Sequence, residues 1–170
     1  TKPSSAASDV YKRQVTGIAG ISRFNLSLLG HSSHAGTTPV KYRKDSLLGL
    51  NEINLMCEKI AKQNEDIIIT IGEIHNNPNV PNAIPSTSTA VIEFRSINNK
   101  KRINTENKIK KLITQIAKKR NLKHQFYKTY DQEAVMCNEK LKKYLVKAFK
   151  KLKMKPFQLP SGATHDASAM

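Results

Sequence analysis

The stretch "ISRFNLSLL" (residues 21–29) alternates apolar and polar side chains. Phe24, Leu26 and Leu28 fall on one side of an extended chain, and polar residues such as Arg23 fall on the other. Because successive side chains of a strand point to opposite faces, this pattern predicts a β-strand with one buried face. A strand of this kind needs neighbouring strands and a layer of helices against its apolar side.

Two segments that follow this strand repeat apolar residues at steps of three and four. In residues 41–63 the repeat consists of Leu47, Leu50, Ile53, Met56 and Ile60. In residues 105–120 it consists of Ile109, Leu112, Ile113 and Ile116. This spacing predicts two amphipathic helices.

Three further segments have the composition of strands. Residues 66–74 and 88–97 are rich in β-branched residues, and residues 122–130 alternate again. Residues 75–85 contain several prolines and asparagines, which indicates a loop. The resulting order, β-α-β-β-α-β, predicts an α+β fold of the ferredoxin-like type, with two helices on one face of an antiparallel sheet.

The two ends of the chain do not continue this pattern. Residues 1–14 have no helical or strand period, so we expect them to be non-native or disordered. A third helix is expected at residues 139–153, followed by the segment "KPFQLPSGATHDASAM". These features suggest an interior fragment of a longer protein.

The chain carries a formal net charge of +16, so nucleic-acid binding is a rival hypothesis. Its lysines, however, lie opposite the apolar stripes of the expected helices, and the expected strands lack the stacking aromatics of RNA-binding sheets. Cys57 and Cys137 match no metal or redox pattern and are expected to be reduced. No apolar run is long enough to span a membrane, which favours a cytoplasmic protein.

Histidine is the side chain most often used for proton transfer and metal binding. His34 lies in "HAGTTP", where small residues leave space beside the ring and threonine hydroxyls could surround an anion. From spacing alone it fits either a turn or a catalytic role. His31 fits a turn role, and His75 and His124 fit surface positions.

Three other residues are candidates for a site. His165, beside Asp166 in "SGATHDA", could be a metal ligand, although one such residue does not make a site. Arg95 ends the strand "VIEFR", where it could hold a carboxylate or simply face solvent. Asn82 lies between two prolines and could be a positioned amide or an ordinary turn residue.

Several motifs occur together in the order and at about the spacing found in M20-type metallo-amidases. They are "VTGIAG" (15–20), "HSSHAGTTPVKYRKD" (31–45), "PNAIPS" (81–86), "EFRS" (93–96) and "LPSGATHDA" (159–167). The chain after residue 14 resembles the hydantoinase/carbamoylase branch of that family. This branch contains N-carbamoyl-L-amino-acid hydrolases, allantoate amidohydrolases and β-ureidopropionases.

The resemblance implies a hydrolase of linear, non-peptide amide C–N bonds that acts on a small anionic carbamoyl or ureido acid. It implies a hinge at residues 15–20 and a lid at 21–130 that forms a homodimer. Residues 131–170 would be the C-terminal part of an α/β catalytic domain. The family uses two divalent metal ions, zinc or manganese, and most of their ligands are expected upstream of Val15. The chain alone is therefore expected to be inactive.

The resemblance also implies roles for single residues. His34 matches the lid histidine that enters the partner subunit's active site and stabilises the oxyanion. Asn82 and Arg95 match the residues that grip the substrate carboxylate, and His165 matches the last metal ligand. Because His34 and Arg95 would act from the same lid, mixing subunits mutated at one or the other is not expected to restore full activity. Thr164 stands where the family has glycine, a departure that bears on how His165 is positioned.

Two alternatives from other classes remain. The chain could be a non-catalytic dimerisation module, or a basic ferredoxin-like domain that binds nucleic acid. An upstream set of metal-ligating residues would favour the enzyme, and salt-dependent RNA binding would favour the last alternative.

Overall fold

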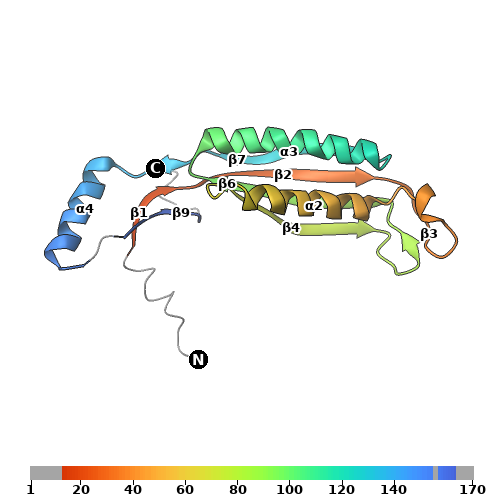
Figure 1. The fold of residues 1–170 in the computed structure, drawn as a ribbon, viewed down its shortest axis with the longest axis horizontal. Coiled ribbons are helices and arrows are strands. Elements are labelled where there is room, and N and C mark those ends of the chain that lie inside the picture. The colour runs from red at the N-terminus through yellow and green to blue at the C-terminus, as the bar shows by residue number, and fades with distance from the viewer. Residues whose placement is uncertain (1–12, 155–156, 164–170) are drawn as a thin grey trace, which may run out of the picture.

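The structure is a computed structural model that describes residues 13–154 and 157–163. Within this part of the chain, a four-stranded antiparallel sheet is covered on one face by two helices (Figure 1). In order across the sheet, the strands are β4 (Ile68–Asn77), β6 (Thr87–Ser96), β2 (Gly20–Leu29) and β7 (Lys123–Gln132). The helices are α2 (Ser46–Lys62) and α3 (Asn99–Lys119). The predicted α+β, ferredoxin-like arrangement is confirmed.

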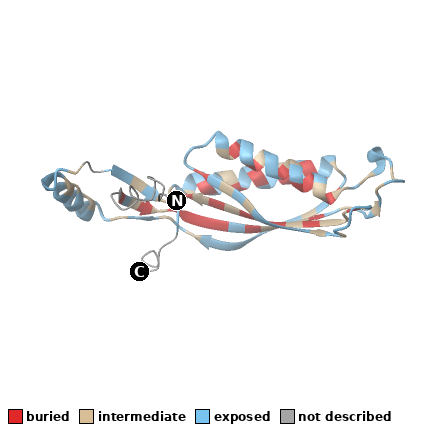
Figure 2. Ribbon diagram, turned by 90° about the horizontal axis from the view of Figure 1, so that it is seen from below, coloured by how far each residue is buried: buried red, intermediate tan, exposed pale blue. Residues whose placement is uncertain are grey.

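The core lies between the helices and the sheet. Strand β2 supplies Phe24, Leu26 and Leu28, all buried, as its alternation predicts. Its partner β6 places Ile92 opposite Phe24 and Ala90 opposite Leu26. Buried residues gather in this layer, whereas the opposite sheet face is more open (Figure 2).

Asp45 caps the start of helix α2, where its carboxylate accepts a hydrogen bond from the Leu48 amide at 3.0 Å. This contact satisfies one of the free amides at the start of the helix. The buried stripe differs slightly from the predicted one. Cys57 is buried in the core, and the neighbouring Met56 is only partly buried against it.

Helix α3 begins at Asn99, six residues before the predicted start (99 against 105). The Asn98 side chain caps it by accepting a hydrogen bond from the Lys101 amide at 3.0 Å. The first turns carry Arg102 and Glu106 on the side that faces the core, and both are buried. A stripe that starts with charged residues has no apolar period, which is why the sequence pattern missed this part of the helix.

The remaining elements form a smaller unit at one end of the sheet. Strand β1 (Arg13–Ile18) lies between β8 (Val135–Met136) and β9 (Phe157–Ser161), and helix α4 (Glu139–Lys151) follows β8. Strands β1 and β9 are parallel, with residue 15 opposite residue 159. Only Ala19 separates β1 from β2.

The strands do not coincide with the expected boundaries of leader, hinge and lid. Gln14 is buried in β1 and donates a hydrogen bond to the Lys142 carbonyl at 3.0 Å, so it belongs to the fold rather than to a disordered leader. Residues 15–18 of the expected hinge form the second part of strand β1, and β7 continues to Gln132, past the expected lid boundary at 130. Residues 1–12 lie outside the described residues.

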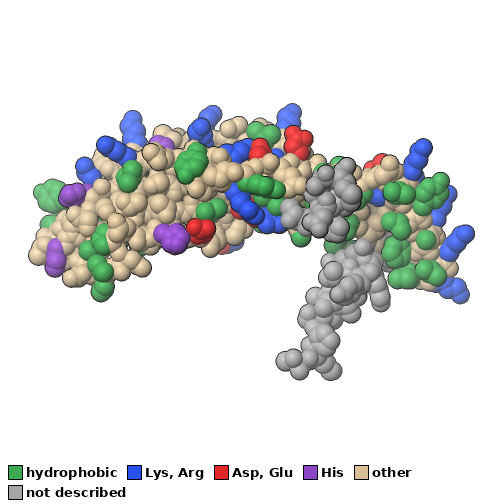
Figure 3. Space-filling view, turned by 180° about the vertical axis from the view of Figure 1, so that it is seen from behind, with side chains coloured by type: hydrophobic (Ala, Val, Ile, Leu, Met, Phe, Trp, Pro, Cys, Tyr) green, Lys and Arg blue, Asp and Glu red, His purple; other side chains and the backbone are tan. Residues whose placement is uncertain are grey.

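Helix α4 contributes no buried residue to the described structure. Its apolar side chains Leu141, Tyr144 and Leu145 are exposed. Figure 3 shows hydrophobic side chains gathered at this end of the molecule, with lysines around them. None of the helices in the described ranges is long and apolar enough to cross a membrane.

Two isoleucines of α3 provide a matched test of this packing. Ile109 is completely buried, whereas Ile103 is 43% exposed on the same helix. We expect Ile109→Ala to lower the free energy of unfolding by about 2–5 kcal/mol, because it leaves a cavity in the core. Ile103→Ala should change it by less than about 1 kcal/mol. Urea unfolding followed by circular dichroism measures both, and equal losses would contradict the assigned helix face.

Candidate functional site

The end of the sheet farthest from α4 carries a small two-stranded sheet, which we call the tip. It pairs β3 (Ser33–His34) with β5 (Ala83–Ile84) in antiparallel fashion. The Ala35 amide also donates to the Asn82 carbonyl at 2.9 Å. Two predicted site residues from distant segments, His34 and Asn82, are thereby brought together, and both are exposed.

Gly30 allows the chain to turn from β2 into the tip. A Cβ atom at this position would lie 1.8 Å from the Lys44 carbonyl oxygen, so only glycine fits. The next amide, that of His31, donates to the same carbonyl oxygen at 3.0 Å. The His31 side chain is exposed, and its backbone serves the turn.

The His34 ring is held by the loop that follows it, residues 35–38, which we call the tip loop. The Gly36 amide donates a hydrogen bond to His34 Nδ1 at 3.1 Å. A Cβ atom at Gly36 would lie 3.3 Å from His34 Cε1. This glycine therefore leaves the space beside the ring that the sequence suggested.

Arg43 fastens both ends of the tip loop. Its Nε donates to the Thr38 carbonyl at 2.9 Å, and its Nη2 donates to the Ala35 carbonyl at 2.7 Å. A guanidinium can span two carbonyls in this way, whereas a lysine ammonium is a point donor. Sequence reasoning missed this residue, and the only signal was an arginine among lysines in "VKYRKD".

A second polar group lies on the helix-free face at the opposite end of the sheet. We call Arg23, Glu93 and Arg95 the arginine cluster. Both arginines donate through Nε to the Glu93 carboxylate, each at 2.6 Å. The Arg23 guanidinium also lies 5.3 Å from the centre of the Tyr130 ring.

Arg95 links this cluster to the C-terminal segment. Its Nη1 donates to the Gly162 carbonyl at 2.8 Å, just beyond β9. Gly162 belongs to the motif "SGATHDA", so the guanidinium lies beside the segment that leads to His165. His165 and Thr164 themselves lie outside the described residues.

The carboxylate of Glu93 is stabilised as an anion. Burial acts to raise its pKa, but hydrogen bonds from Arg95 and Arg23 outweigh this effect. The pKa of Glu93 therefore lies below its usual value, and the group is charged at neutral pH. It holds the two guanidinium groups in fixed positions.

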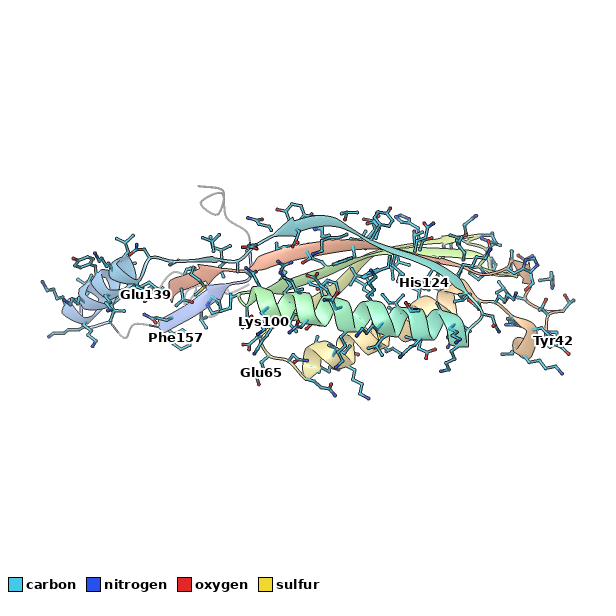
Figure 4. The ribbon with its side chains drawn as sticks, turned by 90° about the horizontal axis from the view of Figure 1, so that it is seen from above. Tyr42, Glu65, Lys100, His124, Glu139 and Phe157 are labelled. Carbon is cyan, nitrogen blue, oxygen red and sulfur yellow. The ribbon has the colours of Figure 1, made fainter. Side chains whose placement is uncertain are left out.

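The tip and the arginine cluster are far apart in one chain. Arg95 pairs with Ile21 at one end of β2, and Thr87 pairs with Leu29 at the other. At roughly 3.3 Å per residue, these two ends of β2 are about 26 Å apart, and the tip lies beyond the second of them. In Figure 4, Tyr42, in the short helix next to the tip (Val40–Tyr42), and Glu139, at the start of α4, lie at opposite ends of the molecule. The structure thus brings Asn82 to His34 but not to Arg95.

A buried ionic network fastens α3 to the sheet near the arginine cluster. The fully buried Arg102 donates through Nη1 to Asp131 at 2.6 Å and to Glu106 at 3.1 Å, and it also contacts Ser22. Burial acts to raise the pKa of Asp131, but hydrogen bonds from Lys128 and Arg102 lower it overall. Sequence reasoning missed this network because its members come from separate elements.

The described residues contain no group of three or more His, Cys, Asp or Glu side chains placed to hold a metal ion. The open sheet face also lacks the platform of an RNA-binding domain. Its central strands present groups such as Asn25, Val91 and Glu93, and the tyrosines Tyr127 and Tyr130 lie on the edge strand β7. Nucleic-acid recognition by stacking on central strands is therefore not supported.

These features define a class of protein: an open-faced α+β domain, polar at both ends, that is joined to a segment of a second unit. The chain belongs to the peptidase dimerisation domain family, whose profile matches residues 16–121. The resemblance to M20-type amidases is confirmed.

Curated relatives and solved structures agree with this assignment. The chain is 32% identical to an N-carbamoyl-L-amino acid amidohydrolase of Geobacillus stearothermophilus, covering 89% of this chain and 37% of the relative. It is 31% identical to an allantoate deiminase of Arabidopsis thaliana, covering 92% and 35%. A hydantoinase/carbamoylase family amidase of Burkholderia multivorans, 22% identical, has the same fold, with a TM-score of 0.87 over 91% of this chain and 38% of that one. The chain thus spans little more than a third of each.

The arginine cluster predicts a pH dependence of stability. Because the pKa of Glu93 is lowered in the folded state, its contribution is present at neutral pH and is lost as the pH falls through the folded value. We expect Glu93→Gln to lower the free energy of unfolding at pH 7 by about 1–3 kcal/mol. The free energy of unfolding of the Glu93→Gln variant should then decline less on acidification than that of the wild type. Urea unfolding between pH 7 and pH 3 measures this, with Arg23→Gln expected to be intermediate. An unchanged acid profile in Glu93→Gln would contradict the assignment.

Proposed function

We propose that this chain is the lid, with an adjoining segment of the catalytic domain, of an amidohydrolase that cleaves a linear C–N bond in an N-carbamoyl or ureido acid. The names of its relatives, an N-carbamoyl-L-amino acid amidohydrolase and an allantoate deiminase, support this reaction class. Both names are compatible with a substrate that carries a carboxylate. The choice between carbamoyl amino acids and allantoate stays open.

One observation carries the proposal: the contact between Arg95 and Gly162. It fixes a guanidinium of the lid against the segment "SGATHDA" of the catalytic part. Arg95 donates through Nε to Glu93 and through Nη1 to the Gly162 carbonyl. These two hydrogen bonds fix the orientation of the planar guanidinium, and with it the position of Nη2. A positioned guanidinium of this kind recognises a carboxylate and orients the substrate for attack on its amide carbon.

His34 and Asn82 act from the partner subunit in this proposal. They lie beyond the end of β2 that is about 26 Å from Arg95, too far to touch the same small substrate within one chain. In a two-fold symmetric homodimer, the tip of one lid reaches the arginine cluster end of the other. Each active site then takes Arg95 from one subunit and His34 and Asn82 from its partner. This revises the expectation that both sets act on a substrate from one lid.

The chemical roles follow from these side chains. Arg95 binds the substrate carboxylate, the Asn82 amide adds a polar contact, and His34 donates a hydrogen bond to the oxygen that gains charge as the amide carbon is attacked. The whole enzyme is proposed to bind two divalent metal ions, zinc or manganese, with His165 among the ligands. The described residues do not provide such a centre by themselves.

Substitution of Arg95 in the intact enzyme tests the proposed carboxylate clamp. Arg95→Ala removes the carboxylate clamp, and we expect the KM for carbamoyl or ureido acids to rise roughly tenfold or more. Arg120→Ala provides the control, because Arg120 pairs with Glu52 on the helix-covered side of the domain. Steady-state kinetics on N-carbamoyl amino acids and allantoate measure both. An unchanged KM for Arg95→Ala would remove this residue from the site.

Mixing two variants tests whether each active site takes His34 and Arg95 from different subunits. An equal mixture of His34→Ala and Arg95→Ala subunits forms mixed dimers in which one of two sites has both native residues. With random exchange, half of the dimers are mixed, so we expect about a quarter of the wild-type rate. Each variant alone should be far less active.

Failure of the mixture to exceed its parents would show that His34 and Arg95 act from one chain. A dimer that forms normally but hydrolyses no carbamoyl or ureido acid would instead favour the non-catalytic dimerisation module. Sedimentation analysis of the same samples separates a lost dimer from a lost active site.

A further inference from the structure

The hydrogen bond between Gly36 and His34 determines which ring nitrogen can carry a proton. A backbone amide can only donate, so His34 Nδ1, 3.1 Å from the Gly36 nitrogen, must accept. A neutral imidazole has one acceptor nitrogen and one N–H donor. If Nδ1 accepts, the proton of the neutral ring lies on Nε2.

We propose that the tip loop fixes His34 as the neutral Nε2–H tautomer, so that the ring presents a hydrogen-bond donor to its target. Gly36 and Arg43 are then positioning residues that act through His34. The proposal rests on the proposed function only for the identity of that target, a substrate oxygen in the partner subunit. The tautomer itself follows from contacts within one chain.

The geometry of the tip loop supports this assignment. Arg43 donates to the Thr38 and Ala35 carbonyls and so closes the loop on which the Gly36 amide is displayed. The Thr38 amide donates to the His34 carbonyl at 3.1 Å, which ties the loop back to the strand. The amide of Gly36 is thus held toward the ring by contacts at both ends of the loop.

Glycine at position 36 also leaves space beside the His34 ring. A methyl group there would lie 3.3 Å from His34 Cε1 and 3.5 Å from Nδ1, a tight but not prohibitive contact. Alanine therefore keeps the amide donor and adds mild crowding, whereas proline removes the donor altogether. Comparing Gly36→Ala with Gly36→Pro therefore distinguishes the effect of losing the hydrogen bond from the effect of crowding the ring.

The tautomer restricts what His34 can do. An Nε2 that carries the proton donates to a developing oxyanion without having to gain a second proton. To bind a metal or accept a proton through Nε2, the neutral ring would have to move its proton to Nδ1 and lose the Gly36 bond. The tip loop thus favours a donor over a base or a ligand.

The first test reads the tautomer directly in the 170-residue chain. Two-bond ¹⁵N–¹H NMR spectra of histidine rings distinguish Nε2–H, Nδ1–H and charged imidazole. We expect the Nε2–H pattern for His34 in the wild type and in Gly36→Ala at a pH where the ring is neutral. Gly36→Pro and Arg43→Gln should shift it toward a mixture. His124, whose Nε2 lies 3.1 Å from Thr114 Oγ1, provides an internal control that none of these changes should move.

The second test asks in the intact enzyme which nitrogen matters. A glutamine amide nitrogen can reach the position of Nε2, whereas an asparagine side chain reaches only as far as Nδ1. We expect His34→Gln to retain at least tenfold more kcat than His34→Asn, with little difference in KM. Arg43→Gln should lower kcat by several fold while leaving the KM for the carboxylate substrate nearly unchanged.

The outcomes separate this inference from the proposed function. An Nδ1–H pattern, or an even mixture in the wild type, would overturn the tautomer assignment whatever the activity. Higher kcat in His34→Asn than in His34→Gln would overturn the donor role of Nε2. An Nε2–H pattern together with full activity of His34→Ala would support the tautomer while removing His34 from the proposed reaction.

Discussion

The structure depends on the continuous pairing of β2 with strands on both sides. Every residue from Gly20 to Leu29 has a partner on β6, and all but the first pair with β7. This pairing fixes which side chains face the helices, because a shift of one residue would exchange the two faces. It also fixes the distance between the two ends of β2, where the tip and the arginine cluster are attached. The tip and the arginine cluster are therefore held at a constant separation.

Arginine and lysine serve different purposes in this basic chain. The lysines of α3 and α4 are mostly exposed and surround the apolar side chains of their helices. Arg43, Arg95 and Arg102 instead donate to defined carbonyl or carboxylate oxygens. These three arginines therefore act through local contacts rather than through the formal net charge of +16.

The periodicity of apolar residues was sufficient to predict the sheet and its helical layer, but not the segments whose buried residues are charged. The alternation in β2 and the helical repeat around Ile109 predicted the sheet and the helical layer, because apolar burial produced both patterns. The start of α3 was missed because Arg102 and Glu106 occupy buried positions that normally hold apolar residues. The pairing of β1 with β9 joins segments that are distant in sequence, so local patterns gave no sign that Gln14 is part of the fold.

Sequence motifs predicted candidate residues but not how those residues are arranged in space. His34, Asn82 and Arg95 were chosen from local motifs, and their pairing could be judged only once the strand register was known. Arg43, Gly36 and Glu93 act through contacts with those residues, which no spacing rule describes.

The single residue between β1 and β2 has a mechanical consequence. Ala19 and residues 133–134 are the connections between the small sheet and the large one. If the large sheet rotates as a unit at these connections, the displacement grows toward its far end. The arm from Ala19 to Leu29 is about 33 Å long, so a rotation of about 10° would move this end of β2 by roughly 6 Å, comparable to the length of a side chain.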